Sequence, residues 1–280
     1  MGFHCLVANP DGPKMPPFAN KVVLVTGGSS GIGKGVALRL ASQGAVVALA
    51  ARTRDTLEQV ATQIEQAGSR ALVLPTDVAD VQQCRAAVEK TVEKFGKLDI
   101  VVCSAGLSMR AYLERCDPAA MEKVVRINFL GTLYTAHAAI PHVKRTQGSL
   151  VALSSLTGLR GIPSYGLYGA TKFAVQGLFD SLRLELQRDG VHVGVVAPGF
   201  VDTPLRVSVL GPDGKSWAKP PDPPFRIWPV EKCVDRVVRL IARRKRQSNL
   251  PWFMGTMFWL DQITNRAVGD WILRWKFPPV

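Results

Sequence analysis

Residues 22–33 read VVLVTGGSSGIG, a short β-branched run that passes directly into a glycine-rich turn. Val22–Val25 predict a buried strand, and the residues from Lys34 onward have the period of a helix. Glycines let a backbone approach a phosphate without a Cβ in the way, and the N–H groups that open the next helix attract an anion. A turn in this context predicts a dinucleotide site. The residues expected to line it are Gly27, Ser29, Ser30, Gly31, Ile32 and Gly33.

Short apolar runs and segments of helical period alternate through most of the chain. Further strands are expected at 45–50, 71–74, 98–103, 150–153 and 191–196. Helices are expected at 34–43, 54–66, 81–95, 118–143, 168–187 and 231–245. Strands that alternate with helices of this length form βαβ units with right-handed crossovers. We therefore predict an α/β fold, a single Rossmann-type doubly wound parallel sheet with helices on both faces.

The composition limits the possible partners. The 280 residues carry a formal net charge of +13, which suits a phosphorylated cofactor, an anionic membrane surface or nucleic acid. The sequence holds no recognised nucleic-acid module, so we expect no nucleic-acid partner. Its five cysteines are odd in number and none stand at CxxC spacing, and the four histidines are scattered. This pattern predicts no metal site and reduced thiols in a cytosol-facing compartment.

A second constellation follows the strand expected at 150–153, which ends in Ser154 and Ser155. Farther along stand Tyr168 and Lys172, which share one face of a helix because they are four residues apart. A cation beside a phenol favours the phenolate and lowers its pKa from about 10. We therefore expect Tyr168 to act as general acid in a reduction or as general base in an oxidation.

Taken together and in order, these motifs resemble those of the short-chain dehydrogenase/reductase family, over about residues 21–246. The GxxxGxG spacing after Thr26 and the YxxxK motif carry the resemblance. It implies hydride transfer between a nicotinamide cofactor and a carbonyl or secondary alcohol. The family's spacing selects Ser155 over Ser154, and only Tyr168, not Tyr165, has a lysine four residues later. The implied catalytic residues are Asn128, Ser155, Tyr168 and Lys172.

The resemblance also implies further cofactor contacts. Asp77 matches an aspartate that accepts a hydrogen bond from the adenine amino group, and Val78 would line the same pocket. Residues 198–203 match the family's Pro-Gly turn under the nicotinamide. The family usually reads Asn-Asn-Ala-Gly after the fourth strand, whereas this chain reads CSAG at 103–106, so a serine replaces an asparagine. The contacts implied here are Ser104, Ala105, Gly106, Tyr168, Lys172, Pro198, Gly199, Val201 and Thr203.

The residue after the second strand distinguishes the two nicotinamide cofactors. An NAD-selective site places an acid there for the ribose 2′-OH, and this chain has Arg52 instead. A guanidinium binds a 2′-phosphate with charge-assisted, often bidentate, hydrogen bonds. We therefore predict NADP(H) as the cofactor, with Arg54 able to assist or replace Arg52. The alternative is that Arg52 lies on the surface at the end of a strand without a ligand.

The chain divides into three expected parts. Residues 1–20 are interpreted as a flexible N-terminal arm, 21–246 as the NADP-binding catalytic domain, and 247–280 as an aromatic C-terminal extension. The proline-rich stretch at about 203–229 is interpreted as a lid. No stretch is apolar enough to span a membrane. The tail carries several tryptophans after a basic run at 243–246, which leaves two interpretations open: contact with an anionic membrane, or packing and subunit association.

The leading hypothesis is an NADP(H)-dependent oxidoreductase for a hydrophobic carbonyl or alcohol, with a steroid-, retinoid- or lipid-like skeleton. It would be cytoplasmic, with possible peripheral contact with a membrane. The resemblance implies a homodimer or homotetramer, because in this family two long helices, here 118–143 and 168–187, usually pair across subunits. The alternative is a non-catalytic NADP(H)-binding regulatory or membrane-associated protein with the same fold. The complete catalytic set favours the enzyme, because a binding module need not keep every member.

Overall fold

The computed structural model describes residues 17–217 and 225–276. Most of the expected N-terminal arm, part of the expected lid and the last four residues lie outside this range. At the end of the expected arm, Phe18 is buried in the core, and its N–H donates to the carbonyl oxygen of Gln43 at 3.1 Å.

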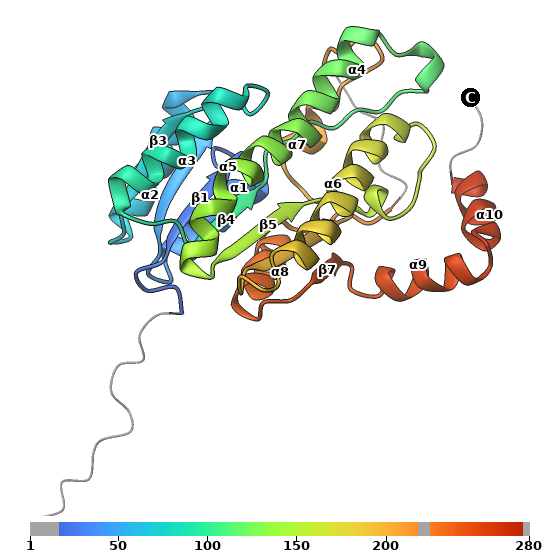
Figure 1. Ribbon diagram of the computed structural model, residues 1–280. Helices are drawn as coiled ribbons and strands as arrows, with labels where there is room; N and C mark the ends of the chain where they lie inside the picture. The colour runs from blue at the N-terminus through green and yellow to red at the C-terminus, as the bar shows by residue number, and fades with distance from the viewer. Residues whose placement is uncertain (1–16, 218–224, 277–280) are drawn as a thin grey trace, which may run out of the picture.

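A seven-stranded parallel sheet forms the centre of the molecule, in the order β3-β2-β1-β4-β5-β6-β7 (Figure 1). The chain order reverses between β1 and β4, the point at which open α/β sheets bind ligands. The predicted doubly wound fold is confirmed. The strands are β1 (Val22–Thr26), β2 (Val46–Ala51), β3 (Ala71–Pro75), β4 (Ile100–Cys103), β5 (Ser149–Leu153), β6 (His192–Pro198) and β7 (Gln247–Leu250).

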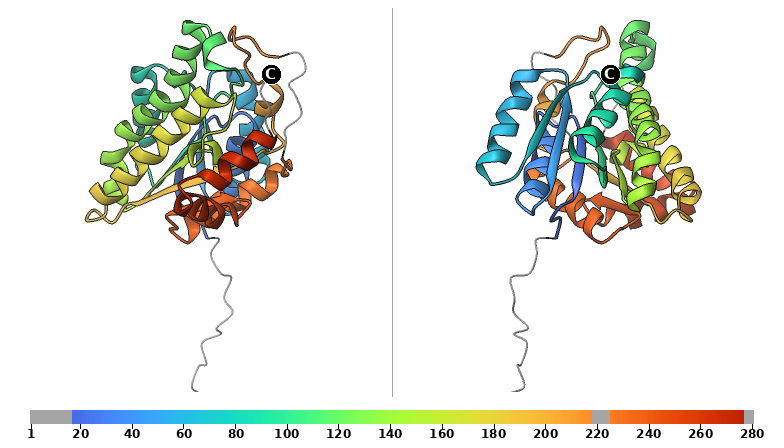
Figure 2. Two further views of the ribbon diagram at one scale, coloured as in Figure 1. Left: turned by 90° about the vertical axis from the view of Figure 1, so that its right-hand side faces the viewer. Right: turned by 60° about the vertical axis from the view of Figure 1, so that its left-hand side comes forward.

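Helices cover both faces of the sheet (Figure 2). One buried cluster joins α1 (Gly31–Ala41), α2 (Arg54–Gln66) and α8 (Val230–Ala242) to the sheet. A second joins α3 (Val81–Phe95), α5 (Gly131–Thr146) and α6 (Gly166–Glu185) to the opposite face. The strands read as continuous apolar runs because both of their faces are buried in this way.

The long helix expected at 118–143 is interrupted in the structure. Pro118–Val125 form α4, Arg126–Leu130 form a π-helical turn, and α5 then continues to Thr146. A π-helical turn widens the helix by one residue and is frequent at functional sites. The turn contains Asn128, which is fully buried.

An edge strand and two helices close the fold after α8. The strand β7 is not readable from the sequence, because Gln247–Leu250 contain no β-branched residue. It nevertheless pairs in parallel with β6, from Val195↔Gln247 to Pro198↔Leu250. The helices that follow are α9 (Met254–Ile263) and α10 (Ala267–Lys276), at the red end of the chain in Figure 1. We call α9 and α10 together the C-terminal hairpin. Among the helices of the described residues, none is long and apolar enough to cross a membrane.

Candidate active site

A cleft of about 940 Å³ opens at the carboxyl ends of the central strands. Loops that follow β1, β4, β5 and β6 form its floor, as expected for a ligand site in an open α/β sheet. Most of the residues predicted for cofactor binding or catalysis meet here. Those that line the cleft are Gly27, Ser30, Gly31, Ile32, Gly33, Arg52, Ser104, Ala105, Gly106, Ser155, Tyr168, Lys172, Pro198, Gly199, Val201 and Thr203.

The glycine-rich turn adopts a conformation that only glycine allows easily. Gly27 and Gly31 have φ of 67° and 52°, in the left-handed region. A Cβ on Gly33 would lie 2.2 Å from the carbonyl oxygen of Gly27, so the helix packs on the turn without room for a side chain. Ser30 caps α1 without a side-chain hydrogen bond, which leaves the first N–H groups of the helix to a ligand. The turn therefore fits a pyrophosphate.

Arg52 and Arg54 differ in their partners. Arg52 follows the end of β2, lines the cleft, and takes part in none of the ion pairs found in the described part of the chain. Arg54 instead pairs with Glu58 on the next turn of α2, at 3.3 Å. Of these two arginines, Arg52 is thus the one whose guanidinium lines the cleft without an ion pair from the described residues, and it fits a phosphate on the adenosine ribose.

Three predicted cofactor residues do not line this cleft: Ser29, Asp77 and Val78. The Asp77 carboxylate accepts a hydrogen bond from the Ala79 N–H at 3.0 Å. Val78 is buried. Its side chain lies within 3 Å of the position that a Cβ on Gly131 would take, so the two segments are in close contact. The structure thus holds the segment after β3 against α5, at one side of the cleft.

Thr26, for which the motif predicted no contact of its own, joins β1 to the loop after β4. Its hydroxyl accepts hydrogen bonds from the N–H groups of Ser104 and Ala105, at 3.2 and 3.4 Å. The Ser104 hydroxyl lies 3.1 Å from the position of a Cβ on Gly33. The shorter side chain at position 104 therefore still reaches the glycine-rich turn, where the family has an asparagine.

Ser155 and Tyr168 face one another at the floor of the cleft. Ser155 is buried after the end of β5, and a hydrogen bond between the two side chains lowers the pKa of the phenol. Burial acts in the opposite direction and is stronger, so the pKa of Tyr168 is raised to about 12. The lowered pKa expected from the neighbouring lysine is therefore wrong for the protein by itself. The phenol is protonated at neutral pH.

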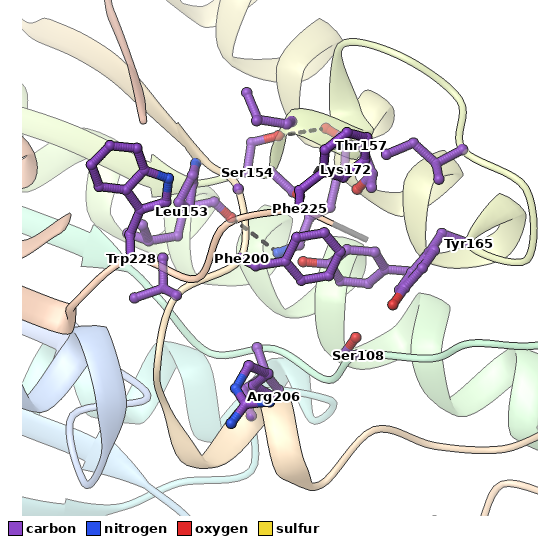
Figure 3. Close-up of a pocket in the computed structure, with 18 of the residues that line it drawn as sticks. Ser108, Leu153, Ser154, Thr157, Tyr165, Lys172, Phe200, Arg206, Phe225 and Trp228 are labelled. Carbon is purple, nitrogen blue, oxygen red and sulfur yellow. Dashed lines mark hydrogen bonds between the residues drawn. The ribbon is translucent and has the colours of Figure 1, made fainter. Parts of the chain in front are cut away.

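Lys172 is itself buried beside this phenol. Its Nζ atom lies 5.8 Å from the centre of the Tyr168 ring and donates a hydrogen bond to the carbonyl oxygen of Leu153 at 3.0 Å (Figure 3). Burial lowers the pKa of the Lys172 ammonium to about 8, because the charged form loses its hydration. The cation thus contacts the end of β5, beneath the ring, and burial controls both pKa values.

The neighbouring Ser154 has a structural contact of its own. Its hydroxyl donates to the carbonyl oxygen of Lys172 at 3.0 Å (Figure 3). A Cβ on Gly158 would lie 2.5 Å from that hydroxyl, so the loop after β5 approaches α6 closely at this point. Ser154 therefore joins β5 to α6, whereas Ser155 lines the cleft.

Asn128 lies directly behind the cleft. Its Oδ1 atom accepts a hydrogen bond from the N–H of Leu107 at 2.7 Å, and its Nδ2 atom donates to the Leu107 carbonyl at 2.9 Å and to the Thr171 hydroxyl at 3.2 Å. Both Asn128 Oδ1 and Lys172 Nζ lie within 4 Å of the position of a Cβ on Gly106. Asn128 thus fixes the loop after β4 against the helix that carries Lys172.

Aromatic rings form one wall of the cleft. Tyr165 packs edge-on against both Tyr168 and Phe200, at centroid distances of 6.4 and 6.2 Å, and Phe200 stacks on Phe225. Figure 3 shows these rings gathered beside Lys172. The part of the expected lid that the structure describes contributes Phe225 and Trp228.

The C-terminal hairpin forms another, outer wall of the cleft, in line with the packing interpretation left open for the tail. The aromatic residues of the tail were visible in the sequence, but its helices were not expected, and nothing in the sequence showed which surface the tail would face. The hairpin and the turn before it contribute mostly apolar side chains: Phe253, Met254, Met257, Phe258, Leu260, Val268, Ile272 and Leu273. One side of the hairpin therefore faces the cleft, and its side chains remain partly exposed there.

Comparison with known proteins agrees with this architecture. The family model described as short chain dehydrogenase matches residues 21–211. The chain belongs to the short-chain dehydrogenase/reductase family. It is 34% identical to 11-beta-hydroxysteroid dehydrogenase-like 3 of Arabidopsis thaliana, over 92% of this chain and 82% of that protein. It is 32% identical to 11-beta-hydroxysteroid dehydrogenase A of Sesamum indicum, over 91% of this chain and 75% of that protein.

Solved structures of dehydrogenases share the fold. An alcohol dehydrogenase from the archaeon Thermococcus sibiricus, complexed with 5-hydroxy-NADP, aligns with a TM-score of 0.72 and 30% identity, over 82% of this chain and 95% of that one. A short chain dehydrogenase from Mycobacterium paratuberculosis bound to NAD aligns with a TM-score of 0.73 and 25% identity, over 83% of this chain and 97% of that one. As a short-chain dehydrogenase/reductase, the chain is an oxidoreductase of CH–OH or C=O groups with a nicotinamide cofactor.

Proposed function

We propose that this short-chain dehydrogenase/reductase reduces the carbonyl group of a bulky, apolar substrate with NADPH. The observation that carries the proposal is the cleft, in which Ser155 and Tyr168 lie beneath walls of aromatic and aliphatic side chains. The relatives named as hydroxysteroid dehydrogenases support a rigid apolar skeleton of the steroid, retinoid or lipid kind. A non-catalytic NADP(H)-binding role is the alternative, and a hydrogen-bonded serine and tyrosine in a cleft of this size favour catalysis over it.

The glycine-rich turn and Arg52 would hold a nicotinamide cofactor, which when bound would supply a hydride for the carbonyl carbon. Ser155 holds the carbonyl oxygen by a hydrogen bond, and the protonated Tyr168 donates its proton to that oxygen as the C–O double bond becomes single. The high pKa of the free phenol keeps that proton in place until the substrate oxygen becomes basic. Lys172 and Asn128 position this pair, because they bind the end of β5 and the loop after β4.

Arg52 supports the choice of NADPH over NADH, since its guanidinium lines the cleft without an acid from the described residues. The test is steady-state reduction of an apolar bicyclic ketone, 2-decalone, with each cofactor in one buffer of fixed salt. A kcat/KM at least about tenfold higher with NADPH is expected from a charge-assisted contact. Equal values would assign Arg52 to the surface, and no turnover with either cofactor would favour the non-catalytic alternative.

We also propose peripheral contact with anionic membranes through the outer side of the C-terminal hairpin. Large apolar side chains face solvent there and just before it: on the hairpin Trp259, Ile263 and Trp271 are 61–74% exposed, and Trp252 before it is 70% exposed. Tryptophans are enriched at membrane interfaces, and the net charge of +13 favours anionic lipid.

Subunit association through α6, which exposes Phe173 and Leu184, is proposed on the family's example, as a homodimer or homotetramer. Sedimentation or light scattering of the purified protein tests that assembly.

A further inference from the structure

Arg160 connects the catalytic loop to the C-terminal hairpin. It lies five residues after Ser155 and eight before Tyr168 in the chain, and its own N–H donates to the carbonyl oxygen of Leu156 at 3.1 Å. Its guanidinium reaches across to the hairpin, where Nε lies 2.8 Å from Oδ2 of Asp261. The loop that carries the proposed catalytic serine thus also binds the outer wall of the cleft.

Further contacts of the same guanidinium reach the second helix of the hairpin and its turn. Nη2 of Arg160 pairs with the carboxylate of Asp270 and donates to the carbonyl oxygen of Arg266 at 3.3 Å. One side chain therefore contacts α9, α10 and the turn between them. The contact with Asp261 is an ion pair without a hydrogen bond from Nε, and the hydrogen bonds of this guanidinium come from Nη2.

The Arg160–Asp261 pair is shielded from water. The side chains of Arg160 and Asp261 are 11% and 10% exposed, whereas that of Asp270 is 54% exposed. Removal of one partner from a shielded pair leaves a charge without compensation, which is strongly destabilising. The pair with Asp261 should therefore contribute most to the position of the hairpin, and the pair with Asp270 less.

Asp261 also joins the two helices of the hairpin to one another. Its Oδ1 atom accepts a hydrogen bond from the N–H of Gly269 at 2.7 Å. A Cβ on Gly269 would lie 2.3 Å from this carboxylate. The close approach of α10 to Asp261 therefore requires a glycine at position 269. Arg160, Asp261 and Gly269 all line the cleft. The cluster is therefore built into the wall that faces the substrate.

We propose that Arg160 is a specificity-determining positioning residue. By binding Asp261 and Asp270 it seats the hairpin over the cleft, and the seated hairpin supplies the apolar surface that a bulky carbonyl compound needs and a small one does not. This inference rests on the proposed function for its substrate readout. The position of the hairpin itself can be measured without turnover.

The experiment compares Arg160→Gln and Asp261→Asn with wild type in the full chain. Kinetics with NADPH are measured on 2-decalone and on 2-butanone, and hydrogen exchange is measured over residues 254–273 without substrate. The ratio of kcat/KM for decalone to kcat/KM for butanone should fall about tenfold or more, because a small displacement of the binding wall weakens its contacts with the bulky ketone. Most of this fall should come from a higher KM for decalone. Exchange over 254–273 should rise in both variants, and Asp270→Asn should give a smaller change.

Arg85→Gln is the matched control, because Arg85 forms an exposed pair with Glu89 on α3, far from the cleft in the fold. It should leave the ratio and the exchange unchanged. An unchanged ratio in Arg160→Gln and Asp261→Asn, or an equal loss on both ketones, would overturn the proposal. If wild type reduces neither ketone, the proposed function fails separately, and exchange alone decides: unchanged protection of 254–273 would then overturn the role of Arg160.

Discussion

The Nζ atom of Lys172 donates a hydrogen bond to the carbonyl oxygen of Leu153 at 3.0 Å, which joins the middle of α6 to the last residue of β5. A buried ammonium that forms so few contacts is poorly hydrated, and its pKa is lowered to about 8. The lysine therefore destabilises the free protein at neutral pH while it positions the site.

Lys172→Met should reveal this cost in the dependence of stability on pH. In wild type the unfolded lysine keeps its proton up to about 10.5, whereas the folded one loses it near 8, so the unfolded state binds more protons between these values. Stability of the wild type relative to Lys172→Met should therefore rise with pH in that window, by roughly 1.5 kcal/mol between pH 8 and about pH 9.5. Urea denaturation of the cofactor-free proteins measures it. Parallel pH profiles would contradict a buried, protonated lysine.

Tyr168→Phe should separate chemistry from binding. Without the phenol no side chain delivers the proton to the substrate oxygen, so kcat should fall by about 10²- to 10⁴-fold. The affinity for NADPH, followed by cofactor fluorescence, should stay within about twofold, because the ring remains. Tyr165→Phe is the control, since Tyr165 shares the cleft but has no lysine four residues later. Similar losses in both variants would remove Tyr168 from its proposed role.

Arg52→Gln should weaken NADPH and spare NADH. Loss of a charge-assisted contact to the 2′-phosphate should raise KM for NADPH by about 10- to 100-fold, with little change for NADH, which lacks that phosphate. The same substitution at Arg54, which is paired with Glu58, should change KM for NADPH only slightly. A larger effect at Arg54 than at Arg52 would assign the phosphate to the neighbouring arginine.

Gly33→Ala should damage the cofactor turn. The added Cβ would lie 2.2 Å from the Gly27 carbonyl oxygen, a distance that forces α1 away from the turn. We expect NADPH affinity to fall at least about tenfold and the free energy of unfolding to fall by about 1–3 kcal/mol. Gly177→Ala on α6 meets no atom within 4 Å and should raise stability by up to about 1 kcal/mol. Isothermal titration measures the NADPH affinity, and denaturant unfolding measures the stability of both variants. Unchanged NADPH binding in Gly33→Ala would refute the close packing of this turn.

Replacement of Trp259 and Trp271 by serine should reduce membrane contact. Both are on the outer side of the hairpin and more than half exposed, so their loss should leave the cleft in place. In flotation with vesicles of phosphatidylcholine and phosphatidylglycerol, the wild type should bind at low salt, where its charge is not screened. The double variant should bind at least about fivefold less, because it lacks aromatic side chains that bind the membrane interface. Leu113→Ser, similarly exposed but between β4 and α4, is the control. Absence of wild-type binding at low salt would exclude this role.

The sequence alone determined the sheet and most of the cleft floor. Glycine positions such as Gly27 and Gly33 are readable because each is required by local backbone geometry, and buried parallel strands are readable because both faces demand apolar residues. Of the four residues assigned to catalysis, helical spacing pairs Tyr168 with Lys172, and the resemblance to the family implies Asn128 and Ser155. The edge strand β7 could not be read, since its pairing depends on backbone hydrogen bonds to β6 and not on its side chains.

Only the tertiary structure decided the electrostatics of the site and the path of the tail. Spacing placed a lysine near Tyr168, but burial, which depends on every neighbouring element, raised the pKa of the phenol to about 12. Likewise the tail's aromatic residues were visible, whereas its seat on the cleft depends on Arg160 meeting Asp261, residues 101 positions apart in the chain. Local geometry is encoded in neighbouring residues, while burial and long-range ion pairs exist only once distant segments have packed together.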